Sequence, residues 1–201
     1  MNNERPITLE HLLPFFASMT MTFDALGQIH HERTALIAGK LAEALACNED
    51  LKRRIRQAAL VHDVGKIAID DSVLFKHGKY TEAERAMMDT HVFKGVEFLR
   101  LLANAGVVVE ESVISIVAQH HENYNGTGYP YRIRNSKIHL GARILRIADF
   151  YEAITSQNRS YRSILKHEDA LMLMSKEKQC FDPKMFEVFT KLREGLITDE
   201  Y

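Results

Sequence analysis

Two pairs of adjacent residues in this sequence have side chains that bind metal ions. His62 and Asp63 are neighbours in the segment VHDVGK, which also contains Lys66. His120 and His121 are neighbours in QHHENYNGTGYP, directly before a glycine-rich stretch. Imidazole and carboxylate groups are ligands of transition metals. A carboxylate also has two oxygens, so Asp63 could bridge two ions.

Each of these residues also has a structural explanation. His62 and Asp63 could form a hydrogen-bonded pair at a helix end. His120 could be a buried core histidine, and His121 could donate to the carbonyl groups of a helix C-terminus. Asp149 is harder to explain in this way, because it lies in the apolar segment RILRIADFYEAIT. A buried carboxylate is rare unless it is paired or bound to a metal, so we expect a cation beside it.

The composition narrows the class of protein. The chain has 201 residues, of which 46% are hydrophobic and 26% are charged, as expected for a globular domain with one sizeable core. The net charge of -1 gives no overall attraction to DNA or RNA. Cys47 and Cys180 lack CxxC spacing, which argues against a disulfide scaffold and a thiolate zinc site. The start has neither a signal peptide nor a membrane span, so we expect a cytoplasmic protein.

The elements that must position these residues are helices. Apolar residues follow the helical period throughout, which predicts an all-α fold. Asn48 is a predicted N-cap, Thr81 and Glu84 form a predicted capping box, and Asp182 with Pro183 starts the last helix. Residues 123–137 are rich in turn formers and predict a long loop. The helices are expected at about residues 24–46, 49–66, 81–103, 110–121, 140–155 and 167–178, and from 182 onward.

The first residues form a separate apolar pattern. We treat residues 1–22 as an N-terminal helical extension and residues 23–201 as the main domain. Leu9, Leu13 and Phe16 recur at helical spacing, although Pro14 should break or kink a helix there. Because exposed apolar stripes tend to mark interfaces, we expect these residues, together with Phe15, to contact a second copy in a homodimer.

The ordered motifs resemble a known family. HDVGK at 62–66, together with HHENYNGTGYP at 120–130, is similar to the HD-GYP subfamily of HD phosphohydrolases. The resemblance covers about residues 24–193 and implies an HD-type bundle of about seven to eight helices with a long GYP loop. The further matching segments are HHERTA at 30–35, KHGKYT at 76–81, His91 with Gly95, RIADFYEA at 146–153, RSYR at 159–162 and FDP at 181–183.

The resemblance implies two divalent metal ions. One ion would be held by His30, His62, Asp63 and Asp149, and Asp63 would bridge to a second ion held by His91, His120 and His121. By residue type either His30 or His31 could be the ligand, and the family spacing selects His30. Ligands without thiolates suit iron or manganese, while zinc is less readily excluded. Leu26 stands where some members have a glutamate for a third ion, which favours two ions.

The resemblance further implies a phosphodiesterase that hydrolyses cyclic di-GMP to pGpG by a metal-bridging hydroxide, and further hydrolysis to GMP stays open. Asp63 and Lys66 would be catalytic, and Lys66 would also contact a substrate phosphate. Arg159 and Arg162 would bind phosphates. The loop residues Gly128, Tyr129 and Pro130 would shape the substrate pocket.

Three alternatives stay open from the sequence. The substrate could be another cyclic dinucleotide, such as cyclic GMP-AMP. The protein could instead be a catalytically silent module that binds a cyclic dinucleotide or a diguanylate cyclase (GGDEF) partner. A phosphohydrolase of the wider HD superfamily is the third, but the GYP loop argues against it.

Overall fold

The structure is a computed structural model that describes residues 6–23, 27–156 and 165–192. Within these residues it is helical, and Thr8 and Val108 form an isolated β-bridge. The all-α class is therefore confirmed. The α-helices are α1 (Leu9–Phe23), α2 (Gly27–Ala44), α3 (Glu49–Val61), α4 (Asp71–Leu74), α5 (Glu82–Asp89), α6 (His91–Asn104), α7 (Glu111–Gln119), α8 (Leu140–Thr155), α9 (His167–Lys176) and α10 (Pro183–Thr190). The 3-10 helices are η1 (Val64–Ala68), η2 (Asn135–Lys137) and η3 (Lys178–Cys180).

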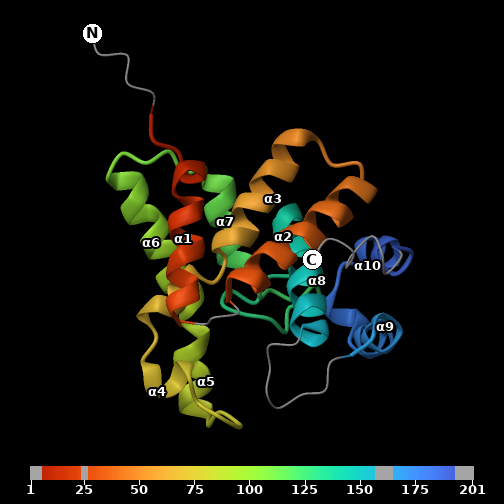
Figure 1. Ribbon diagram of the computed structural model, residues 1–201. Helices are drawn as coiled ribbons and strands as arrows, with labels where there is room; N and C mark the ends of the chain where they lie inside the picture. The colour runs from red at the N-terminus through yellow and green to blue at the C-terminus, as the bar shows by residue number, and fades with distance from the viewer. Residues whose placement is uncertain (1–5, 24–26, 157–164, 193–201) are drawn as a thin grey trace.

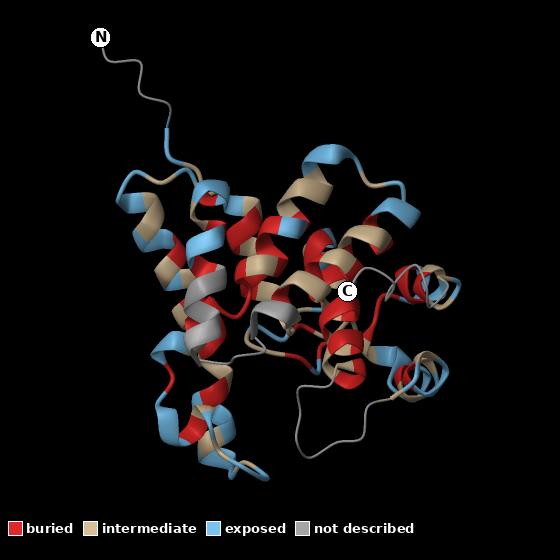
Figure 2. Cartoon of the chain, viewed as in Figure 1, coloured by how far each residue is buried: buried red, intermediate tan, exposed pale blue. Residues whose placement is uncertain are grey.

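Helices α2, α3, α7 and α8 form the centre of the molecule (Figure 1). Helix α2 packs against both α3 and α8, and α7 packs against α3, α6 and α8. Helix α8 is buried along most of its length, with buried side chains from Ala142 to Thr155 (Figure 2). Its acidic residues Asp149 and Glu152 are therefore inside the protein.

The remaining helices extend the bundle at two ends. Helices α4 and α5 lie together at one end below α6, and α9 and α10 lie on the other side, against α8 (Figure 1). A small apolar cluster of Ile69, Val73 and Met88 joins α4 to α5. The long loop 122–139 connects α7 to α8 and begins directly after His120 and His121.

The predicted helix starts are confirmed. The Asn48 side chain accepts a hydrogen bond from Leu51 N, and Thr81 and Glu84 form both bonds of a capping box. The Asp182 side chain caps α10, with Pro183 as its first residue. Two further caps were not predicted. The Asp70 side chain accepts from Ser72 N at the start of α4, and the His139 ring accepts from Gly141 N at the start of α8.

Two predicted helices are shorter than expected. The helix expected over 49–66 ends at Val61 and the chain tightens into η1, so Lys66 lies on a 3-10 turn. The helix expected over 81–103 is divided at Thr90, whose hydroxyl donates to the Met87 carbonyl. This division sets the direction of α6, on which His91 is the first residue.

Helix α1 differs from the prediction in two ways. It continues through Pro14, which is exposed and has no N–H to donate to the Glu10 carbonyl one turn earlier. Leu9, Leu13 and Phe16 are buried in the chain's own core, against α2 and α3. The expectation that these three contact a second copy is therefore wrong. Phe15 alone of the four remains exposed, at 59%.

The boundary between residues 22 and 23 stays a prediction, although α1 shares one apolar cluster with α2. Among the described residues, no helix has the length and apolar character needed to cross a bilayer.

Candidate metal centre

Asp63 lies at the centre of a histidine cluster, at the junction between α3 and η1. Its Oδ2 atom faces one group of histidines: it is 3.4 Å from His62 Nε2 and 3.8 Å from His30 Nε2. Its Oδ1 atom faces another group, 3.3 Å from His91 Nε2 and 4.0 Å from His120 Nε2. The carboxylate therefore presents one oxygen to each group.

The first group is closed by Asp149, which reaches it from α8. Asp149 Oδ1 is 3.6 Å from His30 Nε2 and 3.8 Å from His62 Nε2, and these two nitrogens are 3.3 Å apart. Ligands that bond to one ion at about 2.0–2.2 Å lie roughly 3–4 Å from each other. His30, His62 and Asp149 are spaced as ligands of a single ion would be, and Asp63 Oδ2 lies at similar distances from the two histidines.

The second group comes from the start of α6 and the end of α7. His91 Nε2 is 3.4 Å from His120 Nε2, and the ring centroids of His120 and His121 are 4.0 Å apart. One ligand atom from each of Asp63, His91, His120 and His121 can be chosen so that all lie within 4.8 Å of one another. The structure thus brings together all seven side chains that the sequence named as ligands.

Three of the histidines are held in one orientation by the backbone. The Nδ1 atoms of His62, His91 and His120 lie 2.7, 2.8 and 2.6 Å from the carbonyl oxygens of the residues three positions earlier. A carbonyl only accepts, so each Nδ1 carries the proton and donates it. Each Nε2 then has its lone pair directed into the cluster, as a metal ligand requires.

His30 is held by a carboxylate instead. Its Nδ1 is hydrogen-bonded to Glu152 Oε2, and Glu152 is fully buried. Burial disfavours the charged imidazole, but the bond to Glu152 and the nearby carboxylates outweigh it and raise the pKa of His30. Sequence reasoning gave Glu152 no role. Its position one helical turn after Asp149, on the same face of α8, was the available signal.

The charge states in the cluster suit a cation. Burial would raise the pKa of Asp63, but the charges of Lys66 and the histidines hold it well below its usual value. The pKa of Asp149 is also lowered, against its burial, by neighbouring histidines. Burial lowers the pKa of His120 to about 3 and that of His121 well below 6.5. At neutral pH the carboxylates are therefore charged and these imidazoles are neutral, as metal binding requires.

Lys66 contacts Asp63 directly. Its Nζ is 2.5 Å from Asp63 Oδ2, because residues three apart on a 3-10 helix lie above one another. The side chain is 39% exposed, so its ammonium lies at the edge of the cluster and faces solvent.

The glycine in the same turn allows a close approach between η1 and α6. A Cβ atom on Gly65 would lie 2.0 Å from the His91 carbonyl oxygen and 2.4 Å from Gly95 N. The two backbones therefore touch, and this contact fixes His91 beside Asp63.

The GYP loop folds back over the second group. The Tyr129 ring stacks on His121 with centroids 4.7 Å apart, and Tyr129 N donates to the His121 carbonyl at 3.2 Å. A Cβ on Gly128 would lie 2.2 Å from Asn123 N, so Gly128 is required by this close approach. The Tyr129–Pro130 peptide bond is cis.

Glu122 anchors the outer part of this loop. It is 1% exposed, and its Oε1 accepts hydrogen bonds from Tyr131 N at 2.6 Å and from Arg132 N at 3.1 Å. Sequence reasoning did not single out this residue. It fixes the backbone of Tyr131 and Arg132, directly after the cis peptide bond.

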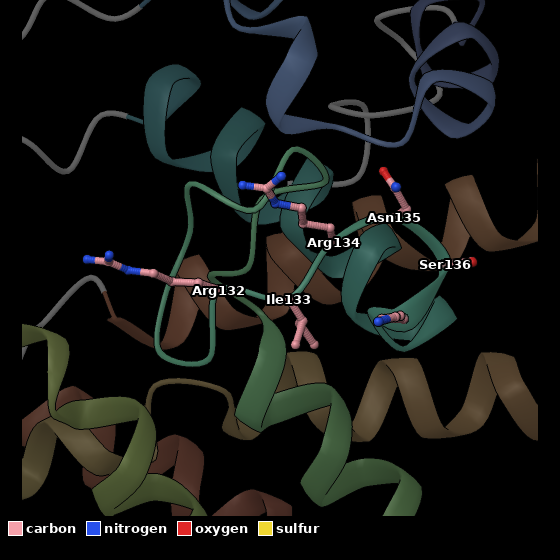
Figure 3. A pocket seen from close by; sticks show the side chains of 6 residues that line it. Arg132, Ile133, Arg134, Asn135 and Ser136 are labelled. Atoms are coloured by element: carbon pink, nitrogen blue, oxygen red, sulfur yellow. The ribbon is translucent and has the colours of Figure 1, made fainter.

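A pocket of about 480 Å³ lies further along the loop, and residues 132–137 line it. Figure 3 shows Arg132 and Arg134 extending from the loop, whereas Ile133 points the other way, toward the helices. None of the cluster side chains lines this pocket, so it is separate from the metal-ligand cluster. The predicted phosphate-binding residues Arg159 and Arg162, and also Leu26, lie outside the described residues.

Comparison with known proteins gives consistent matches. The family described as HD domain matches residues 16–185. The cyclic di-GMP phosphodiesterase response regulator RpfG of Xanthomonas campestris pv. campestris is 39% identical over 166 residues, which are 82% of this chain and 43% of that protein. The 3'3'-cGAMP-specific phosphodiesterase 2 of Vibrio cholerae is 37% identical over 160 residues, 79% of this chain and 30% of that protein. The chain therefore spans less than half the length of these relatives.

Solved structures share the fold. The HDG"Y"P protein Bd1817 of Bdellovibrio bacteriovorus superimposes with a TM-score of 0.66 at 15% identity, covering 90% of this chain and 62% of that one. At this identity the likeness concerns the helical arrangement alone.

Proposed function

The chain belongs to the HD domain family, and from that premise we propose that it is a metal-dependent phosphodiesterase that hydrolyses a cyclic dinucleotide. The observation that carries the proposal is the two-sided contact of Asp63, with one oxygen toward His30 and His62 and the other toward His91 and His120. A bridging carboxylate between two ions makes this contact, whereas a single structural hydrogen bond needs only one oxygen.

The residues fit two divalent ions. Asp63 Oδ1 is buried without a hydrogen-bond partner among the described residues, and such a group is costly unless a cation compensates it. His30, His62 and Asp149 would hold one ion with Asp63, and the remaining three histidines would hold the other. Nitrogen and oxygen ligands favour iron or manganese. Two such ions, when bound, neutralise phosphate charge and make water a nucleophile at neutral pH.

The chain's own residues orient the substrate. The Lys66 ammonium, beside Asp63 and partly exposed, is placed to contact a phosphate oxygen and stabilise developing negative charge. Tyr129 and Pro130, together with Gly128, form the wall of the site next to His121. We keep Arg159 and Arg162 as proposed phosphate ligands.

The reaction is the addition of water across one phosphodiester bond. The water oxygen bonds to phosphorus while the bond from phosphorus to the 3' oxygen breaks, which leaves a 5' phosphate and a 3' hydroxyl. We propose cyclic di-GMP as the substrate, with pGpG as the product and further hydrolysis to GMP. Cyclic GMP-AMP is the second candidate, because similar relatives are named for each nucleotide.

The test is product analysis with metal-loaded protein. The protein is stripped with chelator, reloaded with Fe²⁺ or Mn²⁺ under anaerobic reducing conditions, and incubated with cyclic di-GMP or 3'3'-cGAMP. We expect a linear dinucleotide from at least one of them and none from Asp63→Ala, which should lose both ions or their spacing. Asp70→Ala is the matched control, because Asp70 is an exposed cap of α4. Binding of the nucleotide without turnover by either metal form would instead indicate a silent binding module.

A further inference from the structure

His31 is a buried histidine at the first group of ligands. It follows His30 on α2 and is 5% exposed. Its ring centroid is 5.2 Å from that of His30 and 5.0 Å from that of His62, and its plane is nearly perpendicular to His62, at 87°. Adjacent residues of a helix point about 100° apart, so they normally face different surroundings. Here both rings border the same cluster.

The ligand atoms of His31 come within reach of the other ligands. His31 Nε2 is 4.0 Å from Asp63 Oδ2. Atoms from His30, His31, His62 and Asp63 can be chosen that all lie within 4.8 Å of one another. Opposite ligands of one ion, at bonds of about 2.1 Å, lie roughly 4.2 Å apart. A shift of a few tenths of an ångström would place all four on one ion.

Hydrogen bonds do not explain why His31 is buried. Its Nδ1 is buried without a hydrogen-bond partner among the described residues. The Nδ1 atoms of His62, His91 and His120 are instead bonded to backbone carbonyls. Burying an imidazole without satisfying it costs free energy, so a histidine would be a poor core residue here. Its other ring nitrogen, Nε2, faces Asp63 Oδ2, and its ring lies beside those of His30 and His62.

We propose that His31 is a further ligand of the first ion, beside His30, His62, Asp63 and Asp149. This inference rests on the proposed two-metal function. Five protein ligands leave one position of a six-coordinate iron or manganese ion for water or substrate. Zinc in proteins is usually four-coordinate, so the extra imidazole should favour iron and manganese over zinc.

The test measures metal binding directly. Protein stripped with chelator is titrated anaerobically with Mn²⁺, and bound metal is counted by elemental analysis and by competition with a chelator of known affinity. We expect two Mn²⁺ per chain in the unmodified protein, and in His31→Phe one of them bound at least ten-fold more weakly, with a smaller loss of Zn²⁺ affinity. His77→Phe, an exposed histidine in the loop after α4, should bind as the unmodified protein does. Two Mn²⁺ at unchanged affinity in His31→Phe would overturn the proposal.

Two further measurements keep the result unambiguous. Far-UV circular dichroism of the metal-free variants reports folding, and His31→Leu replaces His31→Phe if the larger ring prevents folding. The visible absorption of the Co²⁺-loaded protein should change in the variant, because the bands depend on the number of ligands, and an unchanged spectrum counts against the ligand. If the unmodified protein binds no metal, the proposed function itself fails. If it binds two ions and the variant is identical, only the role of His31 fails.

Discussion

Glu152 Oε2 accepts a hydrogen bond from His30 Nδ1 across 122 residues of sequence. The pair joins α8 to α2 inside the core, where Glu152 is fully buried. A carboxylate on the far nitrogen of a histidine fixes the ring and increases the basicity of the nitrogen that faces the metal. His30 is thereby pre-oriented toward Asp63.

This relationship predicts that Glu152 controls metal affinity without being a ligand. Glu152→Gln retains the acceptor oxygen but loses the charge. We expect it to lower the binding affinity for one of the two Mn²⁺ ions by about 10-fold. Glu152→Ala should lower the affinity for the same ion by up to about 100-fold. Chelator competition checks both values. Glu187→Gln, on the exposed surface of α10, is the control, and equal affinities in all four proteins would contradict the role.

Substitution of Lys66 should lower the catalytic rate without changing the metal content. Lys66→Met should keep two ions, because a bound metal would replace the ion pair that Lys66 makes with Asp63. Loss of the ammonium should lower kcat by about 100-fold, as for other single groups that stabilise developing charge. Metal analysis and steady-state kinetics on the same sample measure both. Lys191→Met, which changes an exposed lysine at the C-cap of α10, serves as the control. Loss of metal in Lys66→Met would show that Lys66 is structural.

Local chemistry made much of the fold predictable. Asn48, Thr81 and Asp182 cap their helices as the sequence indicated, because a cap depends on residues within one turn. Helix α1 could not be predicted in the same way. Its passage through Pro14 is compensated by the packing of Leu9 and Phe16 into the core, which no local pattern contains.

The site was predictable as far as its motifs extend. The HD and HH pairs named His62 and His120 directly, and the family order added His30 and Asp149. Glu152 was missed because its contact depends on how α8 lies against α2. His31 was set aside because spacing along the chain does not report which way a side chain turns within the core.

The buried histidines predict how stability depends on pH in the metal-free protein. The pKa values of His31, His91, His120 and His121 are lowered, mainly by burial. Below pH 6.5 the unfolded chain therefore binds protons that the folded chain does not, and the free energy of unfolding falls as pH falls. His30 acts in the opposite sense, because its pKa is raised. Four histidines have a lowered pKa and one has a raised pKa, so acidification should destabilise the folded protein.

Below pH 6.5, each additional proton that the unfolded chain binds relative to the folded chain lowers the free energy of unfolding by about 1.4 kcal/mol per pH unit. Urea denaturation with chelator at pH 7.5, 6.5 and 5.5 measures the slope. The metal-loaded protein should start from a higher stability and lose more of it, because protons compete with the ions. A metal-free stability that is constant or rises toward pH 5.5 would contradict the charge states assigned here.

A larger residue at Gly65 should disturb the contact between η1 and α6, which places His91 beside Asp63. In Gly65→Ala the new methyl group meets the His91 carbonyl and Gly95 N, which are backbone atoms and cannot rotate away. We expect a loss of about 1–3 kcal/mol in the free energy of unfolding, the usual range for overpacking. Because the displaced backbone carries His91, the second ion should also bind more weakly than the first.

Gly39 provides the matched control on α2. A Cβ there would have no heavy atom within 4 Å. Alanine in a helix interior is more stable than glycine by about 0.5–1 kcal/mol. Gly39→Ala should therefore leave both ions in place and keep or increase stability. Chemical denaturation and metal counting on the two variants separate the explanations. If Gly65→Ala matched Gly39→Ala in both measurements, the close approach of η1 to α6 would not be what holds His91 beside Asp63.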